Sequence, residues 1–126
     1  MRVLQFALGD DSHTPQNVGT NNLYYLGTHD NNTYMGYLKE LKKEEKQKLC
    51  NLLNVPLSNN KKILLNSIKA LLNSEAHAVI LQIQDLLMQG KKERMNIPGQ
   101  MADCWAYRVP KNFENKLNNM LKLINK

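Results

Sequence analysis

The pair His29-Asp30 is the part of the sequence whose residue types and spacing best suit chemistry. It lies within the polar run 27–33, Gly-Thr-His-Asp-Asn-Asn-Thr, which directly follows an apolar, aromatic segment at 23–26. Active sites form at the carboxyl ends of parallel barrel strands. There an imidazole can donate one hydrogen bond, and a carboxylate can accept two from neighbouring sugar hydroxyls. The pattern indicates a carbohydrate site, although a simple turn or Asx-type cap would have the same local sequence.

A second candidate segment combines an amide, a rigid turn and aromatic rings. Asn96 precedes the turn at Pro98-Gly99, and the run Trp105-Ala106-Tyr107-Arg108 follows closely. Aromatic rings stack on the apolar faces of sugars, while amides form hydrogen bonds with the hydroxyl groups. This pattern also suits carbohydrate. Its alternative is a surface loop whose single Trp is anchored in a core.

The histidines and cysteines form neither a metal-binding nor a disulfide pattern. His13, His29 and His77 are far apart in the sequence, and no H-E-x-x-H motif is present. Cys50 and Cys104 have neither C-x-x-C spacing nor the density of a disulfide scaffold. We therefore expect no metal site, and reduced thiols in a cytoplasmic protein.

Composition places the chain among small globular proteins. It has 126 residues (14.5 kDa), one domain at most, with 42% hydrophobic and 22% charged residues. The apolar stretch 78–81 is far shorter than the roughly 20 residues of a membrane span, and the segment 3–8 is too short for a signal peptide. The net charge of +6 comes from lysines interspersed with glutamates, as in 39–48, which is typical of a solvated helix face. We expect neither a membrane nor a nucleic-acid partner.

The elements that position the candidate residues are predicted from hydrophobic periodicity. We expect strands at 2–8, 23–26 and 76–83, the last of them buried, and loops at 10–22 and 91–110. The predicted helices are one from Leu38 to Pro56, one capped by Ser58, a single turn at 86–88 and a final helix at 113–124. The helix after Ser58 should bury a stripe of four side chains, Leu64, Ile68, Leu71 and Leu72.

Strands that alternate with helical segments indicate an α/β fold with parallel strands. Three such strands cannot close a sheet, so apolar strand edges would be exposed unless something else pairs with them. The pattern therefore favours a part of a larger fold.

Five blocks of the sequence carry a family resemblance, and they occur in the family's order. The blocks are 1–9 (Met-Arg-Val-Leu-Gln-Phe-Ala-Leu-Gly), 25–33 (Tyr-Leu-Gly-Thr-His-Asp-Asn-Asn-Thr), 84–87 (Gln-Asp-Leu-Leu), 94–99 (Arg-Met-Asn-Ile-Pro-Gly) and 105–108 (Trp-Ala-Tyr-Arg). Together they cover nearly the whole chain to about Pro110. They resemble the C-terminal part of the 4-α-glucanotransferases (amylomaltase or disproportionating enzyme, glycoside hydrolase family 77).

The resemblance implies an α-retaining glucan transferase on a (β/α)8 TIM barrel, without a cofactor. Residues 1–126 would form a single segment of that catalytic barrel, holding its sixth to eighth strands. The family moves segments of α-1,4-glucan to the 4-hydroxyl of an acceptor glucan or glucose, through a covalent glucosyl-enzyme. By the same resemblance, Asp30 is the third carboxylate, which stabilises the transition state, and His29 and Asn96 bind the substrate.

The family's nucleophile and acid/base would lie on the fourth and fifth strands, and their motifs are absent from these 126 residues. We therefore expect a C-terminal fragment, or one half of a split enzyme that acts on maltooligosaccharides once an N-terminal companion chain completes the barrel. The alternative is a non-catalytic remnant that binds glucan or a partner protein.

Three smaller departures from the family pattern are visible. Gln16-Asn17-Val18 stands where the family usually has His-Asn-Tyr, and Gln82 replaces a proline. Asp103-Cys104 replaces Gly-Asn ahead of Trp105, which puts the expected contacts of Trp105 in question.

Overall fold

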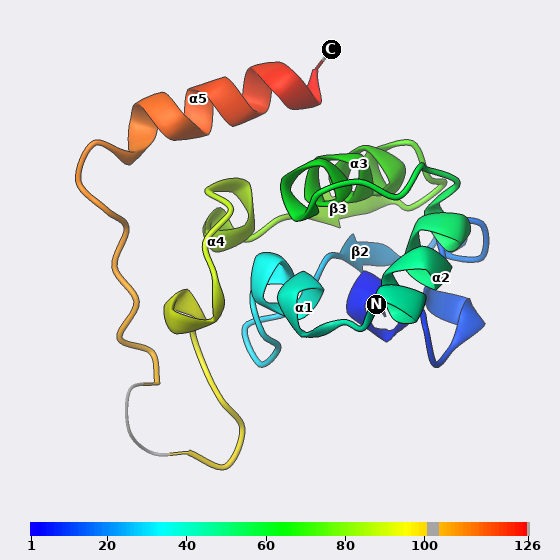
Figure 1. Ribbon diagram of the computed structural model, residues 1–126, viewed down its shortest axis with the longest axis horizontal. Coiled ribbons are helices and arrows are strands. Elements are labelled where there is room, and N and C mark those ends of the chain that lie inside the picture. The colour runs from blue at the N-terminus through cyan, green and yellow to red at the C-terminus, as the bar shows by residue number, and fades with distance from the viewer. Residues whose placement is uncertain (101–103, 126) are drawn as a thin grey trace.

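The computed structural model describes residues 1–100 and 104–125. Its strands are β1 (Arg2–Val3), β2 (Leu23–Tyr25) and β3 (Ala78–Ile80). Its α-helices are α1 (Tyr34–Glu40), α2 (Lys43–Leu53), α3 (Asn60–Leu72), α4 (Ile83–Leu86) and α5 (Phe113–Ile124), as Figure 1 shows. Three short 3-10 turns join them, at Leu4–Phe6, Asp11–His13 and Lys91–Glu93. Asp103, one of the departures noted above, lies outside the described residues.

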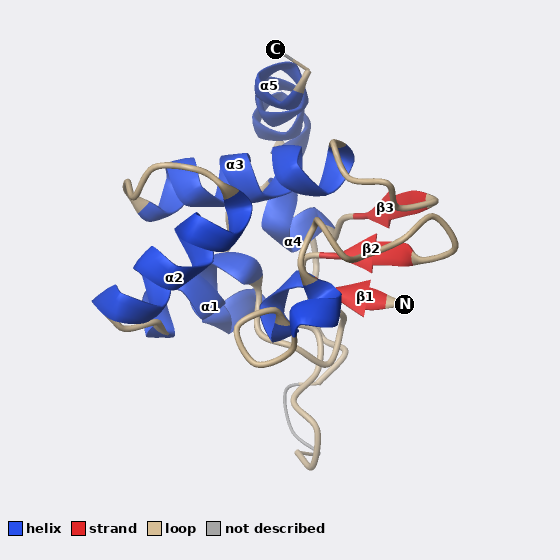
Figure 2. Ribbon diagram, turned by 90° about the vertical axis from the view of Figure 1, so that its right-hand side faces the viewer, coloured by secondary structure: helices blue, strands red, loops and turns tan. Residues whose placement is uncertain are grey.

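The three strands form one parallel sheet in the order β1-β2-β3, which confirms the α/β fold with parallel strands. Arg2 pairs with Tyr24, and Tyr24 pairs with Val79 on the other side. Figure 2 shows the strands side by side, with α1, α2 and α3 grouped to one side of them. Because parallel strands share a direction, their carboxyl ends meet at one edge of the sheet.

The two faces of the sheet have different surroundings. Tyr24 is fully buried in the core beneath the helices, and Val79, its partner in β3, packs against the same core. Side chains alternate along a strand, so the neighbouring residues Leu23 and Ile80 project to the opposite face. Both are exposed there, Ile80 by 40%. One apolar face of the sheet is therefore left uncovered among the described residues.

The core lies between the sheet and the helices α1, α2 and α3. Its fully buried apolar side chains from these helices are Tyr34, Leu38, Leu49, Cys50, Ile63, Leu64, Ile68 and Leu71. A buried hydrogen bond of 2.9 Å joins the Tyr34 hydroxyl to Ser67 Oγ, and Ser67 donates in turn to the Ile63 carbonyl. The core thereby fixes α1, the helix that follows the polar run 27–33.

The first strand is shorter than predicted, because the prediction of a strand at 2–8 is wrong beyond Val3. Residues 4–6 form a 3-10 turn, in which the Ala7 N–H donates to the Leu4 carbonyl at 2.9 Å. That turn places Leu4 and Ala7, three residues apart, on the same buried side. Burial of both side chains is achieved by the turn, whereas an extended strand would have pointed them to opposite faces.

The predicted helix from Leu38 to Pro56 is two helices. The first already begins at Tyr34, because the Thr33 side chain caps it by accepting from the Gly36 N–H. It ends at Glu40, and the Glu45 side chain then accepts from the Lys42 N–H at 2.9 Å to start α2. Helix α2 ends before Pro56 is reached, because Asn54 adopts a left-handed conformation with φ 58°.

The start of α3 and its apolar stripe also differ in detail from the prediction. Asn59, not Ser58, is the N-cap, since its side chain accepts from the Lys62 N–H at 2.9 Å. Leu64, Ile68 and Leu71 are buried as predicted. Leu72 is half exposed, because it lies in the last turn and off the buried face.

The region after α3 contains a strand and a helical turn, as predicted, but the strand is not buried and both elements begin and end at other residues than predicted. A strand forms at Ala78–Ile80, yet it is mostly exposed, because Ala78 and Ile80 lie on the uncovered face of the sheet and only Val79 faces the core. The single helical turn lies at Ile83–Leu86, earlier than the predicted 86–88, and Met88 follows with φ 56°. The helix α5 is confirmed at 113–124 and lies next to α3 (Figures 1 and 2). In the part of the chain described, no helix has both the length and the apolar character needed to cross a bilayer.

Candidate functional site

The polar run 27–33 lies at the carboxyl end of β2, between that strand and α1. A cavity of about 280 Å³ opens beside it on the uncovered face of the sheet. The residues that line this cavity are Met1, Tyr25, Thr28, His29, Asp30, Ile80 and Gln82. Two of the three predicted site residues, His29 and Asp30, therefore face a common hollow.

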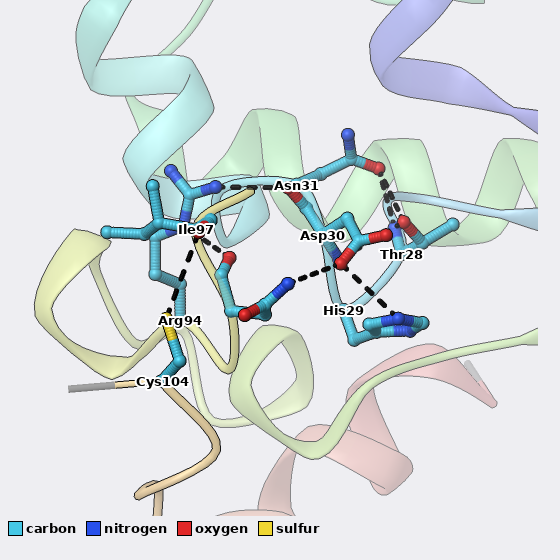
Figure 3. Close-up of polar contacts among 8 residues, drawn as sticks. Thr28, His29, Asp30, Asn31, Arg94, Ile97 and Cys104 are labelled. Atoms are coloured by element: carbon cyan, nitrogen blue, oxygen red, sulfur yellow. Dashed lines mark hydrogen bonds and ion pairs between the residues drawn. The ribbon is translucent and has the colours of Figure 1, made fainter. Parts of the chain in front are cut away.

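Short hydrogen bonds shape the polar run locally. Asn31 Oδ1 accepts from the Thr28 N–H at 2.8 Å and from the Thr28 hydroxyl at 3.0 Å (Figure 3), and the Asn31 N–H donates to the Thr28 carbonyl at 3.0 Å, which closes a turn around His29 and Asp30. The side-chain amide of Gln5, in the 3-10 turn after β1, donates to the Asn32 carbonyl at 2.8 Å. A Cβ at position 27 would overlap that amide, so a larger residue there would require the Gln5 side chain to shift. Residues 27–33 therefore form a turn, as the alternative interpretation expected, and the same turn carries the polar side chains of the candidate site.

The Asp30 carboxylate has one oxygen held and one oxygen open. Oδ1 accepts a hydrogen bond from Asn96 Nδ2 at 2.7 Å and lies 3.3 Å from His29 Nε2 (Figure 3). Oδ2 has no hydrogen-bond partner within residues 1–100 and 104–125. The side chains of His29 and Asp30 are 54% and 48% exposed. One hydrogen bond from Asn96 thus holds Oδ1, with the His29 ring close to the same oxygen, and the second oxygen is presented to solvent.

The second predicted segment lies directly against the first. The Asn96 N–H donates to the His29 carbonyl at 3.1 Å, in addition to the side-chain bond with Asp30. The centroid of the Trp105 ring is 5.0 Å from that of the His29 ring, and the rings are inclined by 41°. Trp105 is 57% exposed, so it is not anchored in the core. The structure therefore brings His29, Asp30, Asn96 and Trp105 together.

Two further residues take part in this arrangement. Gln82 follows β3 and lines the cavity, and Arg94 donates from Nη2 to the Asp30 carbonyl at 3.1 Å. In the sequence, Gln82 stands out only as a departure from the family pattern, and Arg94 only as part of the block 94–99. The signal for Arg94 was its position two residues before Asn96, but periodicity cannot show where its guanidinium points.

Asp85 is a buried carboxylate behind the site. It accepts a hydrogen bond of 2.8 Å from the N–H of Tyr34, the first residue of α1, and is almost completely buried. Burial raises the pKa of the Asp85 carboxyl to about 6, against the opposing effect of the Tyr34 hydrogen bond. Asp85 ties the segment after β3 to the helix that follows Asp30, and it faces the core and not the cavity.

The chemistry available at this site is the recognition of hydroxyl groups. A carboxylate oxygen, an imidazole and two amides converge, with an exposed indole beside them. Retaining glycosyl transfer needs two carboxyl groups about 5–5.5 Å apart, whereas Asp30 alone among the described lining residues is an acid. In the described residues, no group of three or more His, Cys, Asp or Glu side chains could hold a metal ion.

Comparisons with known proteins place this geometry in context. A family model described as 4-alpha-glucanotransferase matches residues 1–114. A chloroplastic/amyloplastic 4-alpha-glucanotransferase of Arabidopsis thaliana is 38% identical over 113 residues, which cover 87% of this chain and 19% of the plant protein. A 4-alpha-glucanotransferase of Aquifex aeolicus is 34% identical over 125 residues, covering 98% of this chain and 26% of that protein.

A solved structure is also similar. The amylomaltase of Streptococcus agalactiae in complex with acarbose superposes with a TM-score of 0.79 at 26% sequence identity. The superposition covers 100% of this chain and 27% of the amylomaltase. The chain thus spans about a fifth to a quarter of the length of the curated relatives it matches, and it corresponds to their C-terminal portion.

Proposed function

The chain belongs to the 4-alpha-glucanotransferase family, glycoside hydrolase family 77, and on that premise we propose that it supplies the C-terminal part of a glucan-transferring active site. The single observation that carries this proposal is the Asp30 carboxylate, held at Oδ1 by Asn96 and open at Oδ2 beside His29. The proposed reaction transfers segments of α-1,4-glucan to the 4-hydroxyl of an acceptor glucan or glucose, with retention.

We propose that residues 1–126 are one segment of a (β/α)8 barrel and that β1, β2 and β3 are its sixth to eighth strands. The uncovered apolar face of the sheet supports this, because the inner face of a barrel is covered only when all strands are present. The similarity to an amylomaltase over the whole chain is also consistent with it. The cavity beside Asp30 would then lie at the carboxyl-terminal mouth of the barrel.

In this proposal each site residue has a distinct role toward a maltooligosaccharide. Asp30 Oδ2 accepts hydrogen bonds from hydroxyls of the donor glucose, and its charge favours the oxocarbenium-like transition state. His29 donates to a hydroxyl of the same sugar. Asn96 holds Asp30 Oδ1 through one amide hydrogen and keeps its remaining amide positions for substrate.

The nucleophile and the acid/base must come from the other strands of the barrel. We propose that they are supplied either by residues joined to this segment or by a companion chain. The reaction then runs in two displacements, in which a carboxylate first forms a glucosyl ester and the acceptor hydroxyl next displaces it. The free thiols of Cys50 and Cys104 are consistent with a reducing compartment such as the cytoplasm, whereas three plant relatives are plastidial by name.

The experiment is a chimera that carries the Aquifex aeolicus residues preceding the matched segment, followed by residues 1–126 of this chain. With maltotriose as substrate, we expect glucose and longer maltooligosaccharides to form. The matched control is the Aquifex aeolicus portion alone, which should form neither. A chimera that folds cooperatively, binds acarbose and yet makes no product would instead favour the alternative, a glucan-binding module.

The same chimera tests the buried Asp85 carboxyl. Burial raises the pKa of this carboxyl to about 6, above its ordinary value of 3.8, so folding favours the protonated acid. The associated stability is present below about pH 4 and is lost as the pH rises through 6. We therefore expect Asp85→Asn to raise the free energy of unfolding at pH 7 by roughly 1–2 kcal/mol, since the amide oxygen still accepts from Tyr34.

At pH 4 the Asp85→Asn and unsubstituted proteins should have nearly equal stability. Urea unfolding at pH 4 and pH 7 measures both differences, and the exposed Glu114→Gln is the control for loss of one negative charge. A loss of stability at pH 7 in Asp85→Asn would show that the buried carboxylate contributes more when ionised than when neutral.

A further inference from the structure

We propose that Arg94 is a positioning residue that locks the two loops of the proposed active site together. Its guanidinium joins the loop of Asp30 to the loop of Asn96 by donating to one backbone carbonyl in each. This inference rests on the proposed function, because it assigns to Arg94 a role in that same reaction.

The geometry of the bridge is direct. Arg94 Nη2 donates to the Asp30 carbonyl at 3.1 Å, and Arg94 Nε donates to the Asn96 carbonyl at 3.2 Å (Figure 3). The same two loops are joined by the Asn96 N–H, which donates to the His29 carbonyl at 3.1 Å. Arg94 contacts only backbone atoms there. It therefore fixes the backbone positions of Asp30 and Asn96, and its own side chain does not line the cavity.

The guanidinium is itself held at a fixed base. Arg94 closes the 3-10 turn Lys91–Glu93, where its N–H donates to the Lys91 carbonyl at 3.3 Å. The carbonyl of Glu93 accepts from the side chain of Gln84 at 3.3 Å, and Gln84 is buried. The buried segment that follows β3 thus holds the backbone from which the Arg94 side chain extends. Through its hydrogen bond to the Asp30 carbonyl, Arg94 in turn holds the backbone at Asp30.

The side chain must be arginine for this function. A guanidinium presents several N–H donors in one rigid plane, so two carbonyls can be reached simultaneously in fixed directions. A lysine ammonium carries the same charge at a single point on a flexible stem. If only the positive charge mattered, lysine would serve equally, whereas a bridge needs the planar fork.

The effect should appear in turnover more than in binding. A displacement of a catalytic group by about 1 Å can cost on the order of 100-fold in rate. In the chimera we expect both Arg94→Ala and Arg94→Lys to lower kcat on maltotriose by about 10- to 100-fold, with KM changed less than about threefold. Guanidinium ion at millimolar concentration should restore part of the kcat of Arg94→Ala and none of that of Arg94→Lys.

The matched control is Lys92→Ala, which removes a cation from the same 3-10 turn; no side-chain hydrogen bond of Lys92 occurs among the described residues. Kinetics of this variant should equal those of the parent chimera. If Arg94→Lys retained full kcat, or if Lys92→Ala lost as much as Arg94→Ala, the bridging role would be overturned.

A readout that does not depend on activity separates this inference from the proposed function. Amide hydrogen exchange of Asn96, whose N–H is bonded to the His29 carbonyl, should be faster in Arg94→Ala by at least about tenfold. The amide of Leu64, in the buried part of α3, should exchange at the parent rate. Unchanged exchange at Asn96 would overturn the bridge even if the chimera were active, and faster exchange would support it even if the chimera made no product.

Discussion

We expect the replacement of Asp30 with Asn in the chimera to lower kcat on maltotriose by several powers of ten, while KM changes much less. The substitution keeps the size of the side chain, and its remaining oxygen can still accept from Asn96. It removes the negative charge and replaces an acceptor oxygen with an amide nitrogen that can only donate. A carboxylate that holds donor hydroxyls acts more strongly as positive charge develops in the transition state than in the ground state.

Each factor of ten in rate corresponds to about 1.4 kcal/mol of transition-state stabilisation, so initial rates over a range of maltotriose concentrations measure the loss directly. His29→Ala is the comparison, because a neutral hydroxyl ligand serves ground and transition states alike and its loss should raise KM with a smaller change in kcat. An Asp30→Asn chimera with a near-normal kcat would show that Asp30 is not the third acid.

The second large effect concerns the 126-residue chain on its own. We expect it to form a molten or aggregating species without disproportionating activity. One face of its sheet leaves Leu23 and Ile80 exposed, and the outer edges of β1 and β3 pair with no strand in the described residues. Parallel sheets are normally covered on both faces, and exposed strand edges promote aggregation.

Near-ultraviolet circular dichroism and a thermal scan at low concentration test this expectation. The lone chain should show no near-ultraviolet signal from fixed aromatic side chains and no sharp thermal transition. When the Aquifex aeolicus portion is added in trans, the aromatic signal and a sharp transition should both be present. A sharp two-state transition in the lone chain would contradict the expectation, and product formation from maltotriose by the lone chain would contradict the proposed division of catalytic groups.

The general plan of the fold could be predicted because it depends on composition and period. The alternation of apolar strands with amphipathic helices was sufficient for the parallel α/β sheet, and five apolar positions within 113–124 were sufficient for α5. The ends of the helices and strands depended on local hydrogen bonds, which hydrophobic periodicity does not reveal. The Thr33 cap, the left-handed Asn54 and the 3-10 turn that buries Leu4 with Ala7 each moved an element by several residues.

The candidate site could be predicted in part, for a similar reason. A strand followed by polar residues places His29 and Asp30 at a sheet edge, and the family resemblance adds Asn96. The proximity of Asn96 to Asp30 is a contact between residues 66 positions apart in the chain. The positions of the Arg94 guanidinium and the Gln82 amide depend on side-chain directions after folding, which sequence spacing does not determine.

A crystal structure of the chimera with acarbose bound would show directly whether Asp30 contacts the donor sugar. We predict a closed barrel in which Asp30 Oδ2 lies at hydrogen-bond distance, about 2.5–3.0 Å, from hydroxyls of the sugar unit in the donor site. In the same structure, Oδ1 should keep its bond with Asn96, and His29 should contact the same sugar unit. Acarbose bound elsewhere, with Asp30 facing solvent, would contradict the claim that this segment supplies the third acid of the active site.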